Sequence, residues 1–340
     1  MRKIFVTGGA GFIGSAFIRL ILSEQPYVNV INYDALTYAG NLENLADIDP
    51  SRHTFIKGDI CDHEAVLDAM PDACDAVFNF AAESHVDRSI QSADEFLRTN
   101  IIGTQVLLDA ARERKAERFV QISTDEVMGS LPDDGDDFFT EESPLQPNSP
   151  YAASKAGAEF VVRAARETFG MDTVITRCGN NYGPRQFPEK LIPLMISNAM
   201  NDEPLPVYGD GKNVRDWIYV DDHCRAIWLA YEKGRPGEAY NIGARNERQN
   251  IEVVHSILDA LGKPHSLIGY VTDRLGHDRR YAIDPTKAET ELGWKPQTNW
   301  KEGLSKTIGW YHENQGWVDH IRNGEYREYY RSMYGKPLGV

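Results

Sequence analysis

A glycine-rich turn between two apolar segments constrains the fold of this chain more than any other feature. Residues 4–7 form a short, mainly apolar run, Gly8, Gly11 and Gly14 follow, and an amphipathic stretch continues to Glu24. The first glycine permits a tight strand-to-helix turn, the second lets the backbone approach a pyrophosphate, and the third lets the helix pack on the strand. The pattern predicts such a phosphate-binding turn, although a turn without a ligand would share these glycines.

A second predicted strand, residues 28–33, ends at Asp34. Asp34 lies about 20 residues beyond Gly14, the spacing of dinucleotide-binding folds. A carboxylate at this place can accept hydrogen bonds from the adenosine ribose and would repel a 2′-phosphate. The pattern therefore favours NAD over NADP as cofactor.

Strands and helices keep alternating along the first half of the chain. Further strands are predicted at 53–57, 75–80, 118–122 and 173–177, and helices at 63–70, 94–114 and 151–169. This alternation predicts an α/β fold with a doubly wound parallel sheet, the NAD-binding Rossmann fold. Ligands of such sheets bind at the carboxyl ends of the strands.

The alternation ends after residue 177, where five prolines fall between residues 184 and 206. Prolines at this density indicate loops and short helices. We expect an NAD-binding domain at 1–178, completed by 214–243, and a smaller mixed α/β substrate domain at 179–340.

Composition narrows the class of protein. The formal net charge is -15, which disfavours nucleic acid as a partner because a phosphate backbone is bound by an excess of Lys and Arg. No apolar run approaches the roughly 18–20 residues of a membrane span, and the residues before the first predicted strand are not expected to be a leader. The cysteines and histidines lack metal-ligand spacing, so no metal is expected. These features predict a cytoplasmic protein.

Tyr151 and Lys155 are spaced to share one face of a predicted helix. A nearby ammonium lowers the pKa of a phenol, so the pair predicts a Tyr base, and the Lys can also hold the nicotinamide ribose. A surface Tyr–Lys pair is the alternative. Thr124 supplies a hydroxyl at the end of an upstream strand.

Asp125 and Glu126 follow that hydroxyl directly. Two further carboxyls imply a second proton-transfer event, in which one removes a proton that a neighbouring ketone has made acidic and the other protonates a hydroxyl that leaves as water. Two close carboxyls also tend to separate in pKa, which leaves one protonated. A solvated or helix-capping acidic pair is the alternative.

Six motifs carry a wider resemblance. They are Asp-Ala-Leu-Thr-Tyr-Ala-Gly-Asn at 34–41, Ala-Ala-Glu-Ser-His-Val-Asp-Arg-Ser at 81–89, Ser-Thr-Asp-Glu at 123–126, Asn-Asn-Tyr-Gly-Pro at 180–184, Glu-Lys-Leu-Ile-Pro at 189–193 and Asp-Arg-Leu-Gly-His-Asp-Arg-Arg-Tyr at 273–281. With them, nearly the whole chain resembles the nucleotide-sugar 4,6-dehydratases of the extended short-chain dehydrogenase/reductase family. The resemblance implies dTDP-glucose as substrate, converted to a 4-keto-6-deoxy sugar.

The resemblance also implies residue roles. Tyr151, Lys155 and Thr124 would act in oxidation at C4, Glu126 would remove the C5 proton, and Asp125 would donate a proton to the departing hydroxyl. The implied cofactor-binding residues are Gly8, Gly11, Phe12, Ile13, Gly14, Asp34, Leu36, Thr37, Asp59, Ile60, Ala81, Ala82, Ser84, Thr99, Tyr151, Lys155 and Asn181. The implied substrate-binding residues are Ser84, Thr124, Asn180, Lys190, Leu191, Pro206, Tyr208, Arg215, Asn250, Arg274 and His277.

Several of these assignments have simpler alternatives. Arg215 could form a surface salt bridge instead of binding a pyrophosphate, and Asn250 could be a helix N-cap. Met128 stands where the family usually has Tyr, so it either fills space beside the sugar pocket or changes the preferred sugar.

Other functions of the same fold stay open. A sugar-nucleotide C4 epimerase or a glucuronate decarboxylase needs no Asp–Glu pair, and an NAD-sensing binding protein needs no Thr–Tyr–Lys set. The predicted helices 94–114 and 151–169 are apolar on several faces, which predicts a homodimer through a four-helix bundle, as in the family. The nucleobase, the hexose and the pathway are not determined by these residues.

Overall fold

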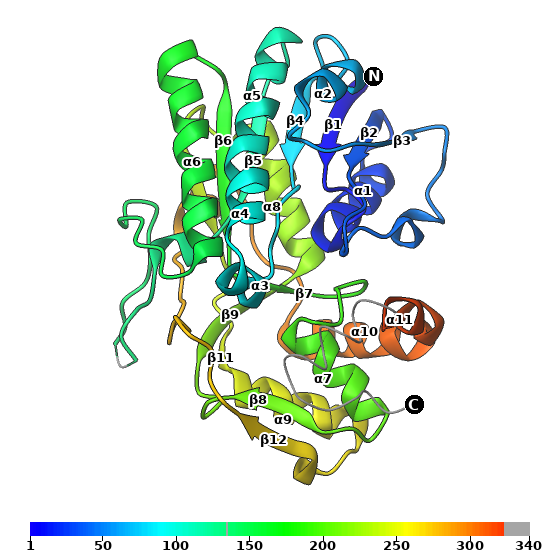
Figure 1. Ribbon diagram of the computed structural model, residues 1–340, viewed down its shortest axis with the longest axis vertical. Coiled ribbons are helices and arrows are strands. Elements are labelled where there is room, and N and C mark those ends of the chain that lie inside the picture. Colours follow the sequence, from blue (N-terminus) through cyan, green and yellow to red (C-terminus); the bar gives the residue numbers. More distant parts are fainter. Residues whose placement is uncertain (134, 323–340) are drawn as a thin grey trace.

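A seven-stranded parallel sheet forms the centre of the protein (Figure 1). The computed structural model describes residues 1–133 and 135–322. The strand order is β10-β6-β5-β4-β1-β2-β3, and it reverses beside β1, which confirms a doubly wound α/β fold. The strands are β1 (Arg2–Thr7), β2 (Val28–Asp34), β3 (His53–Lys57), β4 (Ala76–Asn79), β5 (Phe119–Thr124), β6 (Thr173–Cys178) and β10 (Ala239–Ile242).

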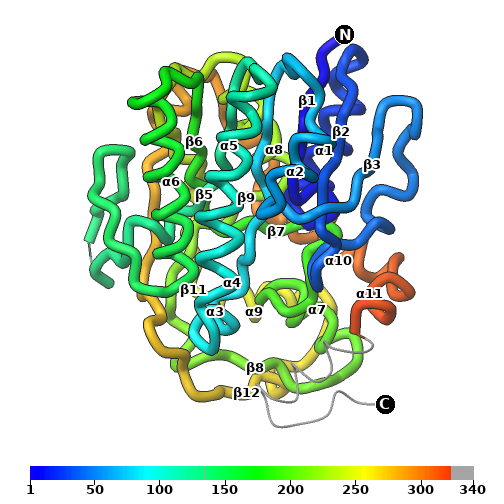
Figure 2. The backbone as a smooth tube through the Cα atoms, turned by 45° about the horizontal axis from the view of Figure 1, so that its top comes forward, coloured from blue at the N-terminus to red at the C-terminus, as the bar shows by residue number. Residues whose placement is uncertain are grey.

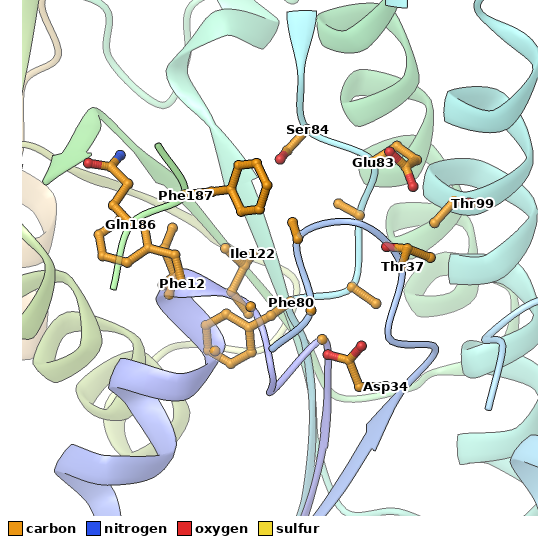
Figure 3. A pocket seen from close by; sticks show the side chains of 18 of the residues that line it. Phe12, Asp34, Thr37, Phe80, Glu83, Ser84, Thr99, Ile122, Gln186 and Phe187 are labelled. Atoms are coloured by element: carbon orange, nitrogen blue, oxygen red, sulfur yellow. The ribbon is translucent and has the colours of Figure 1, made fainter. Parts of the chain in front are cut away.

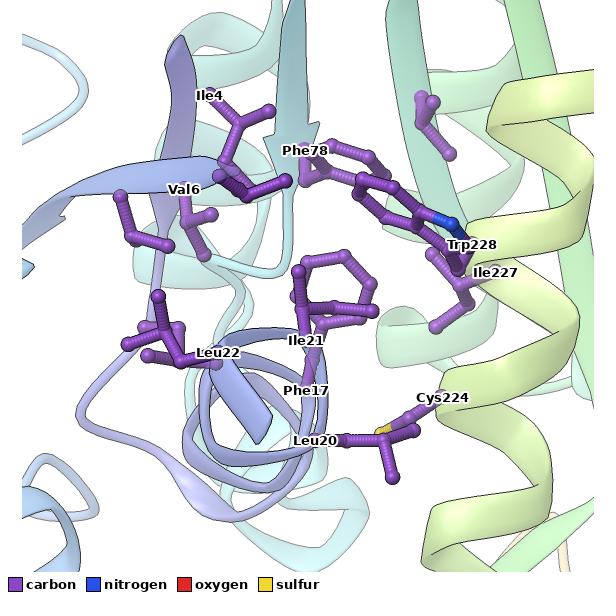
Figure 4. Close-up of a cluster of buried hydrophobic side chains, with 14 of the residues drawn as sticks. Ile4, Val6, Phe17, Leu20, Ile21, Leu22, Phe78, Cys224, Ile227 and Trp228 are labelled. Atoms are coloured by element: carbon purple, nitrogen blue, oxygen red, sulfur yellow. The ribbon is translucent and has the colours of Figure 1, made fainter. Parts of the chain in front are cut away.

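Helices cover both faces of this sheet, as its apolar strands require. On one face α1 (Phe12–Glu24) packs beside α8 (Val220–Lys233), and on the other lie α2 (His63–Ala69), α5 (Thr104–Glu113) and α6 (Pro150–Phe169). Phe17, Phe78 and Trp228 form the aromatic centre of the first layer (Figure 4). The rings of Phe17 and Phe78 have centroids 4.7 Å apart.

The long helix expected at 94–114 contains a π-helical segment. It consists of α4 (Asp94–Leu97), the π-helical η2 (Arg98–Gly103) and α5, and the short α3 (Val86–Gln91) precedes it. In η2, a Cβ on Gly103 would lie 2.5 Å from Ile60 Cδ1, so the helix approaches the sheet edge closely there. Such π-helical segments often occur at functional sites.

A smaller body lies beyond the carboxyl ends of the large sheet (Figures 1 and 2). It holds a three-stranded sheet of β11 (Glu247–Gln249), β9 (Val214–Tyr219) and β7 (Asn180–Tyr182), and a two-stranded sheet of β12 (Ile268–Val271) and β8 (Leu205–Tyr208). Its helices are α7 (Leu191–Met200), α9 (Asn250–Leu261), α10 (Trp300–Glu313) and α11 (Gln315–Arg322). Short helical turns are η1 (Leu42–Leu45), η3 (Asp125–Met128), η4 (His265–Leu267) and η5 (Ala288–Leu292).

The segment 214–243 contributes to both bodies. Its α8 and β10 belong to the layers of the large sheet, whereas β9 pairs with β7 and β11 in the smaller body. The division into domains 1–178 and 179–340 stays a prediction, and residues 323–340 lie outside the described residues. Among the described residues, no helix is both long and apolar enough to cross a membrane.

Candidate active site

A cavity of about 360 Å³ opens at the carboxyl ends of the central strands (Figure 3). All but one of the expected cofactor residues line it. They are Gly8, Gly11, Phe12, Ile13, Gly14, Asp34, Thr37, Asp59, Ile60, Ala81, Ala82, Ser84, Thr99, Tyr151, Lys155 and Asn181. The exception is Leu36, which is absent from the lining and whose N–H donates to Asp34 Oδ1 at 2.8 Å.

The turn after β1 has the backbone that its glycines predict. Gly8 has a φ of +68°, and a Cβ there would lie 2.6 Å from the backbone nitrogen of Ala81 at the end of β4. A Cβ on Gly14 would lie 2.2 Å from Gly8 O. Gly9, which the sequence did not single out, is equally confined, because its Cβ would meet Asn32 Oδ1 at 2.2 Å.

Asp34 lies at the end of β2, on the edge of the cavity. Its two oxygens accept the N–H groups of Ala10 at 2.9 Å and Leu36 at 2.8 Å. Burial raises the pKa of the carboxyl, and these two hydrogen bonds oppose the rise. Each oxygen keeps a lone pair for a ribose hydroxyl, so the glycine turn and Asp34 together fit an NAD molecule.

Thr124, Glu126, Tyr151 and Lys155 line the same cavity. Tyr151 lies in the first turn of α6, which begins at Pro150 after the N-cap Ser149, whose Oγ accepts the N–H of Ala152 at 3.1 Å. Lys155 Nζ donates to the carbonyl of Ile122 in β5 at 2.6 Å. The sequence therefore brings residues of β5, η3 and α6 to one point.

The expected lowering of the Tyr151 pKa by Lys155 is wrong for this state of the protein. Burial raises the pKa of Tyr151 well above its usual value, and the carboxyls of Glu126 and Asp125 raise it further, while a hydrogen bond with Thr124 lowers it. Lys155 is itself buried, which lowers its pKa to about 8. The Lys155 ammonium donates a hydrogen bond to the Ile122 carbonyl.

The two adjacent carboxyls occupy different surroundings. Asp125 is 2% exposed and is not part of the cavity lining, and within residues 1–133 and 135–322 its Oδ2 has no hydrogen-bond partner. Burial, followed by the Glu126 charge, raises the pKa of Asp125 well above its usual value. Burial also raises the pKa of Glu126, but the charges of Arg274, Arg215 and Lys190 oppose it. Both shifts favour the protonated form, and the nearby cations oppose the shift more at Glu126, which is also the member that lines the cavity.

The expected substrate residues form two groups. Ser84, Thr124 and Lys190 line the cavity, and Lys190 Nζ donates to Ser84 O at 2.8 Å. The others lie outside its lining: Asn180, Leu191, Pro206, Tyr208, Arg215, Asn250, Arg274 and His277. Asn180 begins β7, Leu191 begins α7 and Pro206 lies in β8.

Arg215 is not a surface residue. Its side chain is buried, its guanidinium donates to the carbonyls of Val214 at 2.7 Å and Asp278 at 2.8 Å, and it stacks 4.2 Å from the Tyr281 ring centre. No carboxylate of the described residues forms an ion pair with it, so the salt-bridge alternative is wrong. Glu126 and Asp125 are the acids whose charges act on it.

Two further members of this group carry unpartnered polar atoms. Arg274 Nη1 lies 3.7 Å from Asp87 Oδ1, while the buried Arg274 Nε has no hydrogen-bond partner among the residues that the structure describes. Asn250 is the first residue of α9 and Gln249 is the N-cap, so the N-cap alternative for Asn250 is wrong. The buried Asn250 Oδ1 is without a partner among the described residues.

Tyr208 and His277 complete this group. The hydroxyl of Tyr208 donates to Asp87 Oδ2 at 3.3 Å, and His277 Nδ1 lies 2.6 Å from Asp273 Oδ1. Burial lowers the pKa of His277 to about 4, and the charges of Arg274 and Arg215 add to this effect. Within the described residues, no group of three or more His, Cys, Asp or Glu side chains could hold a metal ion.

Met128 is 2% exposed and belongs to a small hydrophobic cluster. It is buried among Val127, Phe139, Ala156 and Tyr281, in the layer between η3, α6 and the segment after β12. It does not contribute to the cavity lining. The structure therefore places it as a core residue and gives no support to a changed sugar pocket.

Sequence reasoning missed two acids of the cavity, Glu83 and Glu189. Glu189 lines it, and burial raises the pKa of Glu189 to about 7. His85 Nε2 lies 3.5 Å and Arg88 Nη2 3.8 Å from its Oε2. All four residues belong to motifs that carried the resemblance, so their positions, but not their contacts, were visible in the sequence.

Comparisons with known proteins agree with this geometry. Residues 5–307 match the family model described as GDP-mannose 4,6 dehydratase. The dTDP-glucose 4,6-dehydratase of Xanthomonas campestris pv. campestris is 52% identical, over 96% of this chain and 98% of the relative.

Solved structures give the same result. DesIV, a dTDP-glucose 4,6-dehydratase from Streptomyces venezuelae crystallised with NAD and TYD bound, is 50% identical with a TM-score of 0.90, covering 94% of this chain and 99% of that one. The UDP-glucose 4-epimerase of Thermotoga maritima, solved with UDP-glucose, is 30% identical with a TM-score of 0.84, covering 92% and 99%.

Proposed function

Because this chain belongs to the GDP-mannose 4,6 dehydratase family, we propose that it converts dTDP-D-glucose to dTDP-4-keto-6-deoxy-D-glucose and water. The observation that carries the proposal is the placement of Glu126 in one cavity with the Thr124–Tyr151–Lys155 set and a dinucleotide-binding turn, with the buried Asp125 next to it in the chain. Oxidation at C4 needs only the hydroxyl, Tyr and Lys, whereas loss of water needs a second acid and base.

NAD is the cofactor that the cavity fits. Gly8, Gly11 and Gly14 leave room for a pyrophosphate at the start of α1, and Asp34 offers oxygens to the ribose. When bound, NAD supplies the nicotinamide that accepts the C4 hydrogen as hydride and returns it to C6. Lys155 would hold the nicotinamide ribose from below, since it lines the cavity between β5 and α6.

The oxidation step would use Tyr151 and Thr124. Tyr151 would take the proton of the 4-hydroxyl. Thr124 is hydrogen-bonded to Tyr151 and would form a hydrogen bond with the same sugar oxygen. Because the raised pKa keeps the Tyr151 phenol protonated, Tyr151 can take the 4-hydroxyl proton only after it has released its own proton to solvent. A nearby ammonium favours a phenolate, so Lys155 would assist that release.

The elimination step would use the two carboxyls in opposite protonation states. Glu126, ionised and in the cavity, removes the C5 proton, and Asp125, which its burial keeps protonated, donates a proton to the 6-hydroxyl as it leaves as water. Arg215 and Arg274 lie close enough to stabilise the Glu126 charge. Both would also bind the pyrophosphate of the nucleotide, for which guanidinium groups are suited.

The C4 epimerase of similar structure marks the second candidate function. It shares the fold with this chain at 30% identity. Epimerisation at C4 involves no loss of water, so it does not require the carboxyls of Asp125 and Glu126. A decarboxylase is disfavoured because it also has no use for that pair, and an NAD-sensing binding protein is disfavoured because it needs no Thr124, Tyr151 and Lys155 together.

A substrate panel tests the proposal. Purified protein is incubated with dTDP-, UDP- and CDP-glucose, and alkali is then added, which converts a 4-keto-6-deoxy product to a species absorbing in the near ultraviolet. We expect the strongest signal with dTDP-glucose. Silence with all three sugars, or formation of a C4 epimer without loss of water, would contradict the proposal.

A homodimer is the assembly that the surface favours. Leu97, Ile102, Phe160 and Phe169 are 43%, 54%, 58% and 51% exposed, and all lie on α4, η2 and α6. Such an apolar face fits a four-helix bundle with a second copy of the chain. Sedimentation equilibrium should show a dimer for the native protein and a monomer for the Ile102→Glu, Phe160→Glu variant, and a monomeric native protein would contradict the bundle. The cytoplasmic location stays a prediction.

A further inference from the structure

A buried ion pair lies directly beneath the reacting residues. Glu159 of α6 and Arg177 of β6 are 3% and 7% exposed. Arg177 Nη2 lies 2.7 Å from Glu159 Oε2, and Nε lies 3.1 Å from both carboxylate oxygens. Ser123 Oγ of β5 donates to Glu159 Oε1 at 2.6 Å. One carboxylate thus joins a helix to two neighbouring strands.

Ser123 itself lines the cavity, and Glu159 and Arg177 lie next to residues that do. Glu159 follows Lys155 by one turn of α6 and Tyr151 by two, so the three share one helical face. Ser123 precedes Thr124, and Arg177 precedes Cys178, in a register that pairs Ser123 with Arg177 and Thr124 with Cys178. The group therefore connects the Tyr–Lys helix to the strand that ends in Thr124.

We propose that Glu159 and Arg177 are a positioning pair that, through Ser123, sets the placement of Thr124 relative to Tyr151 and Lys155. This inference rests on the proposed function, because the reaction at C4 requires those three groups to meet one oxygen. Neither residue of the pair lines the cavity, and no task in the reaction falls to them directly.

Two observations favour a positioning role over a purely stabilising one. Replacing a buried ion pair by apolar side chains is often neutral or stabilising for a protein. The stability of the fold alone therefore does not require the charges of Glu159 and Arg177. The carboxylate also makes a directed hydrogen bond to Ser123 at the point where β5 ends, and no apolar side chain could restrain that backbone in the same way.

The pair also affects the charge of Lys155. The groups around Lys155 are Tyr151 and Glu159 on its own helix, Cys178 at the end of β6, and Asp125 and Glu126, whose charges act on Tyr151. Glu159 raises the pKa of Lys155 against the lowering by burial. Without that carboxylate, and with Arg177 left unpaired, the pKa of Lys155 should fall below its value of about 8.

A second ion pair on the same strands is a matched control. Arg118 donates to Asp172 through Nε at 2.9 Å and through Nη2 at 2.8 Å, just before β5 and β6 begin. Asp172→Asn weakens the contact of the same two strands at their amino ends, far from the cavity. It controls for any loss of activity that follows from weaker strand packing alone.

The experiment compares Ser123→Ala, Glu159→Gln and Asp172→Asn. Small misplacements of reacting groups can lower rates by about 100-fold, so Ser123→Ala and Glu159→Gln should lower kcat by roughly 10- to 100-fold, with KM for dTDP-glucose changed by less than about twofold. Asp172→Asn should keep kcat. Unchanged kcat in Ser123→Ala and Glu159→Gln, or an equal loss in Asp172→Asn, would overturn the proposal.

A titration of Lys155 keeps the inference separate from the proposed function. The rate of carbamylation of Lys155 by cyanate, followed by mass spectrometry across a pH series, gives its pKa without any turnover. Glu159→Gln should shift that pKa downward and Asp172→Asn should not, and an unshifted pKa in Glu159→Gln would refute the pair's role. Native protein inactive on every sugar nucleotide would refute the proposed function alone.

Discussion

Substitution of Gly8 by Ala tests how closely the cofactor turn approaches the sheet. Ala at a φ of +68° carries a backbone strain of about 1–2 kcal/mol. The added Cβ would also lie 2.6 Å from Ala81 N and 2.7 Å from Phe80 C. Both are backbone atoms, so one segment must shift, at about 1–3 kcal/mol more. We expect Gly8→Ala to lower the free energy of unfolding by about 2–5 kcal/mol.

Gly262 provides a matched control for the strain alone. It ends α9 with a φ of +64°, and a Cβ there would meet nothing within 4 Å. Gly262→Ala should therefore lose only about 1–2 kcal/mol and should keep its NAD. Urea unfolding gives the two free energies, and the absorbance of NAD released by acid gives the cofactor content. Equal stability of the two variants, with full NAD in Gly8→Ala, would refute the close approach.

Three further outcomes are expected. Glu126→Gln should still allow NADH to form on mixing with dTDP-glucose, seen at its near-ultraviolet absorbance, but should slow loss of water by about 100- to 10,000-fold; full turnover would exclude Glu126 as the C5 base. Glu126 must be ionised, so activity should fall as the pH drops through its raised pKa, and Lys155 must be protonated, so activity should also fall as the pH rises through its pKa of about 8. A rate that does not change between pH 4 and 10 would contradict both assignments. Met128→Tyr should lower the free energy of unfolding by about 1–3 kcal/mol and leave the order of preference among sugar nucleotides unchanged, since Met128 is a core residue; an altered order in the substrate panel would contradict that position.

The sequence predicted those parts of the site that follow from local pattern and strand order. Gly8, Asp34 and Thr124 each stand where a strand ends, and parallel strands bring their carboxyl ends to one edge. Tyr151 and Lys155 share a face because α6 begins where Pro150 and Ser149 place it. These relations need only residue type and spacing.

Other properties depend on three-dimensional surroundings that no local pattern encodes. The raised pKa of Tyr151 comes from burial and from Glu126 and Asp125, which outweigh the charge expected from Lys155. The burial of Arg215 follows from the pairing of β9 with β11 and β7 in the smaller body. The Glu159–Arg177 pair joins residues that are distant in the chain, so only the fold reveals it.

The path of the C4 hydrogen tests the central claim most directly. The protein is incubated with dTDP-glucose that carries deuterium at C4, and the product is examined by mass spectrometry and NMR. The account predicts a 4-keto-6-deoxy sugar that keeps the deuterium, now on C6, because the hydride is held by NAD and returned within one turnover. A product with the deuterium still on C4, or one that has lost both the deuterium and the water, would contradict it.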